Sequence, residues 1–282
     1  MVSLLFGLII GFSLGLTGGG GSIFAVPLLV YGLAMPAHEA VGVSLVAVGA
    51  TALSGAIVRL RRREVEFKAA VLFGIAGIVG APLGAVLGAK LPSEFLLGGF
   101  ALLMLLVATR MWLQAIHHPT DARIVRAGDD ALLDATSGPA CRINPAGGLA
   151  LTSRCALVLV FSGVITGLLS GLFGVGGGFL IVPALTLVAS LSMQRAVATS
   201  LLIIAIISAS GSTAYLLAGR PLALTVTALF VLGGLGGMVL GGRLSRRFAG
   251  PQLQKLFATA MVGVAIYILI AILFQVVELS TT

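Results

Sequence analysis

The chain has 282 residues, of which 59% are hydrophobic and only 9% are charged. Because a soluble domain carries about 25% charged residues, this composition excludes a water-soluble enzyme, a nucleic-acid-binding domain and a disordered protein. The formal net charge of +8 does not indicate nucleic acid, since the basic residues lie in short segments between apolar runs, where they orient a membrane protein. We therefore expect an integral membrane protein.

Apolar stretches follow one another along most of the chain. Runs of about 18 apolar residues are long enough to cross the hydrocarbon layer as a helix. The stretches cover residues 3–35, 40–58, 69–89, 95–113, 155–191, 196–218, 222–242 and 256–277. This pattern predicts an all-α polytopic membrane protein.

One long polar segment, residues 117–154, divides the apolar stretches into two groups. It is rich in Asp, Arg and Pro and is predicted to be a solvated linker. The predicted organisation is therefore a first membrane repeat at 1–116, the polar linker, and a second membrane repeat at 155–282.

The two halves of the chain are similar to each other in sequence. With an offset of 156 residues, the glycines and the proline of the first stretch coincide with those of the fifth. In the same register, Ala40–Leu45 coincides with Ala196–Leu201 as an Ala-Val-x-x-Ser-Leu block. Agreement at so many places in one register predicts a true internal repeat.

The first and fifth stretches are too long for one crossing. As continuous helices they would span roughly 50–56 Å at 1.5 Å per residue, against about 30 Å of hydrocarbon. Glycine-rich runs interrupt them at residues 18–21 and 174–178, and such runs favour unwinding because glycine loses the most backbone entropy in a helix. Each stretch is therefore either a broken crossing or a re-entrant hairpin of two half-helices.

The basic residues favour the hairpin. If each long stretch crosses once, the chain has eight spans, and its 17 basic residues divide 11 to 6 between the two sides. If each stretch dips in and returns, only Lys90 and Arg220 lie outside, and the linker is cytoplasmic. The positive-inside rule prefers this second division. The halves are then inverted repeats, each with a glycine-broken hairpin and three transmembrane helices, a plan typical of secondary transporters.

The glycine runs are the candidate substrate site. The half-helices that follow them are expected to start near Ser22 and Phe179, with unpaired N–H groups and the positive end of a helix dipole. These groups, together with nearby hydroxyls, suit a small anion at the membrane midplane. The candidate binding residues are Thr17, Gly18, Gly19, Gly20, Gly21, Ser22, Ser44, Gly174, Gly176, Gly177, Gly178, Thr199 and Ser200. The alternatives are plain helix breaks, and hydroxyls that bond backbone carbonyls one turn back.

Charged residues precede the second helix of each half. His38 and Glu39 in the first half correspond to Arg195 in the second, and the inverted topology places them on opposite faces. They are candidates for gating the two mouths, and His38 or Glu39 for proton coupling. The alternative is a plain helix start in water. The basic run Arg59–Arg63 is expected to contact anionic lipid headgroups.

Four rows of glycines at four-residue spacing begin at Gly7, Gly80, Gly163 and Gly233. Small residues at this spacing let helix backbones approach closely in lipid. Packing within the bundle is the expected role, and the seam of a homodimer is the alternative.

Catalytic chemistry is not indicated. No carboxylate lies well inside an apolar run, so a buried acid–base pair is not expected. The glycine spacing near Gly174 lacks the βαβ context and the phosphate-binding Lys of nucleotide loops. The sequence therefore predicts neither an enzyme nor a cofactor or metal site.

The glycine runs and the prolines after them resemble a known family. Gly15-Leu-Thr-Gly-Gly-Gly-Gly-Ser22 leads to Val26-Pro27, and Gly171-Leu-Phe-Gly-Val-Gly-Gly-Gly178 leads to Val182-Pro183. These motifs resemble the TauE/SafE family of membrane permeases. The resemblance implies a carrier in a bacterial-type inner membrane for sulfur-containing anions such as sulfite, sulfoacetate or other sulfonates, often in the export direction. A passive anion channel of the same architecture is the alternative function.

Overall fold

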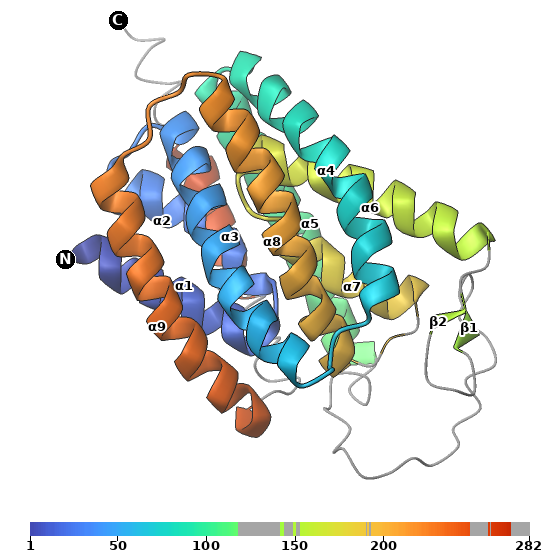
Figure 1. Cartoon of the computed structure of the whole chain (residues 1–282). Helices are drawn as coiled ribbons and strands as arrows, with labels where there is room; N and C mark the ends of the chain where they lie inside the picture. Colours follow the sequence, from blue (N-terminus) through green and yellow to red (C-terminus); the bar gives the residue numbers. More distant parts are fainter. Residues whose placement is uncertain are drawn as a thin grey trace, which may run out of the picture.

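The computed structural model describes residues 1–117, 142–143, 149–150, 153–189, 191, 193–248, 259 and 261–271. Figure 1 shows a bundle of helices drawn from both halves of the chain. The first half forms α1 (Val2–Thr17), the 3-10 helix η1 (Gly20–Phe24), α2 (Ala25–Gly32), α3 (Ala37–Arg61), α4 (Phe67–Lys90) and α5 (Ser93–His117). The second half forms α6 (Ser153–Phe173), α7 (Gly178–Val188), α8 (Met193–Leu217), α9 (Leu224–Phe248) and the helical segment Met261–Ala271. In the linker, β1 (Arg142–Ile143) pairs antiparallel with β2 (Leu149–Ala150).

The prediction of an all-α polytopic membrane protein is confirmed. Within the described residues, five helices are long and apolar enough to cross a membrane, namely α3, α4, α6, α8 and α9. Large apolar side chains such as Ile75, Val79 and Leu83 on α4 are 57–60% exposed. Such apolar surface is normal for a protein that faces lipid.

Helix ends extend slightly beyond the apolar stretches. The structure begins α3 at Ala37 and ends it at Arg61, whereas the apolar stretch covers 40–58. Glu39 lies in the first turn of α3, and Arg59 and Arg61 lie in its last turn. Charges of these signs complement the helix dipole at its two ends, which is why the helix continues into its polar flanks.

The glycine rows form the two closest helix seams, and both seams lie inside the bundle. In the first, α1 packs along α9, and a side chain on Gly7 or Gly11 would collide with the backbone of Phe230 or Gly234. In the second, α6 packs along α4, and a side chain on Gly167 would collide with the backbone of Gly77. The rows therefore serve packing within the chain, the first of the two roles considered from the sequence.

Each seam joins one half of the chain to the other, and equivalent helices make equivalent contacts. The first helix of the first half, α1, packs along α9 of the second half, and the first helix of the second half, α6, packs along α4 of the first half. At the centre, α3 and α8 run antiparallel, since Gly42 lies against Tyr215 and Gly49 lies against Ser208. These two central helices, which carry the matching Ala-Val-x-x-Ser-Leu blocks, therefore point in opposite directions (Figure 1).

Charged residues collect at the two ends of this bundle. We call the end at which α3 begins and α4 and α8 finish the Lys90 end, and the opposite end the Arg61 end. The described charged residues of the Lys90 end are His38, Glu39, Lys90, Glu94 and Arg220. The described basic residues of the Arg61 end include Arg59, Arg61, Arg62, Arg63, Lys68, Arg154, Arg195 and Arg243.

Candidate anion site at the two glycine breaks

The first long stretch turns back on itself. α1 ends at Thr17, and Gly18 takes the left-handed conformation with φ 74°, its N–H bonding the carbonyl of Leu14 at 2.7 Å. After the turn, Gly21 lies against Ser13, and Gly32 lies against the ring of Phe6. Because contacts continue from the turn to the start of α1, the segment η1–α2 runs antiparallel to α1 as a hairpin.

The second break has the same place in its half but a different backbone. Gly174, Gly176 and Gly177 all have left-handed φ values, between 67° and 73°. A residue with a Cβ is strained in this conformation, whereas glycine is not. The half-helix α7 then begins directly at Gly178. Three of the four residues 174–177 are thus required to be glycine by the turn itself.

The predicted starts of the half-helices need correction in the first half. The sequence placed them near Ser22 and Phe179. The structure begins α7 one residue before Phe179, but in the first half a 3-10 turn from Gly20 precedes the α-helix, which starts only at Ala25. Pro27 lies in the first turn of α2, where its missing N–H is tolerated.

The tips of the two hairpins meet. A Cβ on Gly19 would collide with the backbone of Gly178. Each tip also abuts the central helix of the other half, since a Cβ on Gly174 would lie 2.7 Å from the Cα of Val41 and one on Gly18 would meet Val197. The candidate glycines of both halves are therefore brought to one junction, although 156 residues separate them in sequence.

Two serines hold the breaks in a reciprocal arrangement. The Ser200 hydroxyl of α8 donates a 2.7 Å hydrogen bond to the carbonyl of Gly18 in the first break. The Ser44 hydroxyl of α3 donates a hydrogen bond to the carbonyl of Gly174 in the second break. Both serines are fully buried. At each break, a backbone carbonyl has lost its partner in the helix, and a serine of the other half donates the hydrogen bond that replaces it.

The other candidate hydroxyls also bond the backbone. Thr17 donates to the carbonyl of Ser13 at 2.8 Å, and Ser22 donates to the carbonyl of Gly19 at 2.7 Å. Thr199 accepts a 3.0 Å hydrogen bond from the N–H of Glu66 at the start of α4. The bonds of Thr17 and Ser22 correspond to the structural alternative stated for the hydroxyls, and they leave lone pairs rather than protons free at these two residues. The Thr199 bond instead joins α8 to the start of α4.

Three serines that the sequence did not single out lie beside the breaks. Ser13, Ser170 and Ser208 are at most 5% exposed, and their hydroxyls have no hydrogen-bond partner in the described part of the chain. Ser13 lies against Gly21, Ser170 lies 3.5 Å from a Cβ on Gly177, and the Ser208 hydroxyl lies 3.2 Å from a Cβ on Gly176. A buried unpaired hydroxyl is costly, so it needs a water or a ligand.

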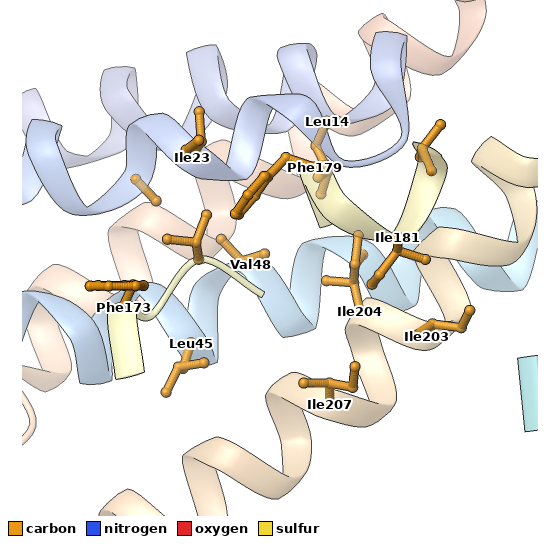
Figure 2. Close-up of a cluster of buried hydrophobic side chains, with 14 of the residues drawn as sticks. Leu14, Ile23, Leu45, Val48, Phe173, Phe179, Ile181, Ile203, Ile204 and Ile207 are labelled. Atoms are coloured by element: carbon orange, nitrogen blue, oxygen red, sulfur yellow. The ribbon is translucent and has the colours of Figure 1, made fainter. Parts of the chain in front are cut away.

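Apolar side chains enclose the junction (Figure 2). Leu14 of α1, Phe179 of α7 and Ile204 of α8 are all at most 4% exposed, and Val48 of α3 lies against Gly176. Backbone N–H groups at Gly19, Gly20 and Gly178 donate no backbone hydrogen bond within the described residues. Donors in such a low-dielectric setting attract a negative charge more strongly than they would in water.

The structure places the gating candidates at opposite ends. His38 and Glu39 are partly buried at the Lys90 end, where His38 lines a small pocket with Tyr215 and Arg220. Arg195 is exposed near the start of α8, at the Arg61 end. Among the described residues, no group of three His, Cys, Asp or Glu side chains could hold a metal ion.

Comparison with known proteins supplies the family. Residues 3–268 match the family described as "Sulfite exporter TauE/SafE". A "Probable membrane transporter protein" of Xylella fastidiosa (strain 9a5c) is 34% identical over 272 residues, covering 93% of this chain and 91% of the relative. "Probable membrane transporter protein YunE" of Bacillus subtilis is 29% identical over 254 residues, covering 86% of each chain. No solved structure matches the chain. The resemblance found in the glycine motifs is confirmed: the chain belongs to the TauE/SafE family, and it is a multi-pass membrane transporter.

Proposed function

We propose that this transporter is a secondary carrier for small sulfur oxyanions such as sulfite or a sulfonate, and that it binds them where the two hairpin tips meet. The observation that carries this proposal is the set of buried unpartnered hydroxyls beside the breaks, Ser13, Ser170 and Ser208. An oxyanion accepts hydrogen bonds on several oxygens and would satisfy these hydroxyls together with the free N–H groups of the tips.

The substrate class follows from the donors. The junction offers N–H and O–H donors and glycine surfaces that admit close approach, but no described acidic side chain. Such a site favours a compact anion over a cation. The family description names sulfite, and a sulfonate presents the same pyramidal arrangement of oxygens.

The proposed topology has six crossings, with the Arg61 end and the linker in the cytoplasm of a bacterial-type cell. It is supported by the antiparallel α3 and α8, by hairpins that enter from opposite ends, and by the basic residues gathered at the Arg61 end. A reporter fused after Thr282 should then lie outside. A cytoplasmic reporter would contradict this topology.

Transport requires the tips to separate. In the described conformation the backbones of Gly19 and Gly178 touch, so the junction is closed between them. We infer alternating access, in which the hairpin of one half moves against the central helix of the other. An inside-negative potential is worth about 2.3 kcal/mol per charge per 100 mV, so it drives anion export without a coupling ion.

The test is flux into proteoliposomes that contain only the purified chain. The proposal predicts saturable movement of sulfite or a sulfonate that Ser170→Ala and Ser208→Ala weaken. Single-channel currents instead of slow saturable flux would favour the passive channel of the same architecture. Absence of flux for every sulfur oxyanion tried would overturn the proposed substrate class.

A further inference from the structure

Among the described residues, two basic side chains lie apart from the basic residues of the Arg61 end. Lys90 and Arg220 lie at the Lys90 end, which the proposed topology places outside. The positive-inside rule gives a reason for basic residues on the cytoplasmic side and none for these two. Their presence at this end therefore calls for a separate explanation.

The fold brings both cations into one cavity of about 180 Å³. Lys90 comes from the last turn of α4, and Arg220 comes from the loop between α8 and α9. Tyr215 of α8 lines the same cavity. A space of this size holds a small oxyanion together with several waters, since one water needs only about 10–15 Å³ by this kind of measure.

The loop holds Arg220 in place over this cavity. The Arg220 guanidinium carbon lies 5.4 Å from the centre of the Tyr215 ring, a cation–π arrangement. The Tyr215 hydroxyl donates a 3.3 Å hydrogen bond to the carbonyl of Pro221, and Gly219 makes the turn with φ 67°. Neither Lys90 nor Arg220 forms an ion pair with a carboxylate of the described residues. Other charged or titratable groups at this end include His38, Glu39 and Glu94, with Glu39 close enough to Tyr215 to act on it electrostatically.

A second, smaller pocket of about 10 Å³ shares part of its lining with this cavity. It shares Tyr215 and Arg220 with the cavity and is also lined by His38, Val41 and Gly171. Val41 lies directly against the backbone of Gly174 in the second break. One residue of this pocket, Val41, therefore also contacts the second break, next to the proposed substrate site.

The other end of the bundle has different chemistry at the equivalent positions. With the offset of 156, Tyr215 corresponds to Arg59 and Arg220 corresponds to Glu64. There the Arg59 guanidinium and the Glu64 carboxylate form an ion pair of 3.3 Å. The two loops share their left-handed turn residue, Gly219 in one and Arg63 in the other, so the backbone is alike. At the Arg61 end this position carries an acid that pairs with a cation, whereas at the Lys90 end it carries a cation that has no ion pair among the described carboxylates.

We propose that Lys90, Arg220 and Tyr215 form a second, outer anion site at the Lys90 end, distinct from the hairpin tips. It binds small sulfonates or other oxyanions as they leave or approach the junction. Two cations at the rim of an apolar cavity raise the local concentration of anions and repel cations. Its role in transport rests on the proposed function, but its binding of anions does not.

The test measures charge selectivity at the cavity rather than flux. Ala218 lines the cavity, and Ala218→Cys places a thiol there. We compare how fast this thiol reacts with two methanethiosulfonate reagents, one that carries a sulfonate group and one that carries a trimethylammonium group. Any labelling of the parent chain, which has two cysteines of its own, is subtracted as background. We expect the anionic-to-cationic rate ratio to fall on the order of 10-fold with Arg220→Gln or Lys90→Gln. Arg220→Lys, which keeps the charge, should preserve the ratio, as should Arg61→Gln at the other end.

The outcomes separate this proposal from the proposed function. A ratio unchanged in both Arg220→Gln and Lys90→Gln overturns the outer site, even if the chain transports sulfite. A ratio that falls as expected in a chain that moves no sulfur oxyanion supports the outer site and overturns the proposed function. Methanesulfonate should slow the modification by the anionic reagent in the Ala218→Cys chain, and lack of protection would also count against the outer site.

Discussion

The two glycine breaks occupy equivalent places in the two halves but differ in how strictly they need glycine. The first uses one left-handed glycine, Gly18, and then a 3-10 turn before α2 begins. The second uses three left-handed glycines, and α7 starts directly after them. Of the three unpartnered serines beside the breaks, two, Ser170 and Ser208, lie beside the second break. The second break is therefore the more constrained of the two and carries more of the proposed anion contacts.

The largest expected effect separates the two breaks by one substitution. At Gly176, φ is 67° and a Cβ would lie 2.9 Å from Val48, so Gly176→Ala should abolish most of the sulfite flux in proteoliposomes. At Gly20 the nearest neighbour of a Cβ is the Thr17 hydroxyl at 3.3 Å, so Gly20→Ala should retain most of the flux. Gly236→Ala on α9, where nothing lies within 4 Å, is the matched control. Equal loss at Gly20 and Gly176 would remove the asymmetry between the breaks.

The next effect concerns the unpartnered serines. Ser208→Ala and Ser170→Ala should each raise the KM for sulfite about 10-fold, which corresponds to about 1.4 kcal/mol of binding. Their thermal unfolding in detergent should not shift downward, because neither hydroxyl has a partner to lose in the described part of the chain. A lower midpoint with unchanged KM would show a purely structural role for these serines.

The reciprocal serines should behave in the opposite way. Ser44→Ala and Ser200→Ala each remove a hydrogen bond to a buried carbonyl of a break. We expect a loss of stability of about 1 kcal/mol for each, measured by thermal unfolding in detergent. Because the bonds are equivalent, the two losses should be similar. A loss of stability in only one of the two variants would mean that the two hydrogen bonds do not stabilise the breaks equally.

The smallest effect concerns the ion pair at the Arg61 end. Glu64→Gln breaks the ion pair between Glu64 and Arg59. The Arg59 side chain is 13% exposed and the Glu64 side chain is 19% exposed. The expected change in stability is below about 1 kcal/mol, but the change removes a negative charge from the position equivalent to Arg220. A cysteine introduced at the mouth of this end should then react faster with anionic thiol reagents. An unchanged rate would mean that the ion pair does not set the charge of this mouth.

Much of the fold could be predicted from the sequence because its signals are local. The apolar stretches predicted the long helices, and the four-residue glycine spacing predicted close packing, as seen where Gly11 meets Gly234. The glycine run also predicted the turn at Gly18. The partners of these elements could not be predicted, since the contacts join residues far apart in the chain, such as Gly77 with Gly167 and Ser44 with Gly174.

The candidate site was predicted in part. The glycines of both breaks do meet, and Ser44 and Ser200 were visible as equivalent positions of the repeat. Ser13, Ser170 and Ser208 were missed because a lone serine in an apolar helix resembles one that bonds its own backbone. These three serines differ from such a serine only in being buried without a hydrogen-bond partner, which is a property of the folded chain and not of the sequence. One local signal could have suggested that Ser170 faces the break: it lies four residues, or about one helical turn, before Gly174.

Equilibrium binding of sulfite tests the central proposal most directly. Isothermal titration of the purified chain should give saturable binding, and the double variant Ser170→Ala with Ser208→Ala should raise the dissociation constant at least about 10-fold while its thermal unfolding midpoint stays level. The same dissociation constant in the wild-type and the double variant would contradict an anion held at the hairpin tips.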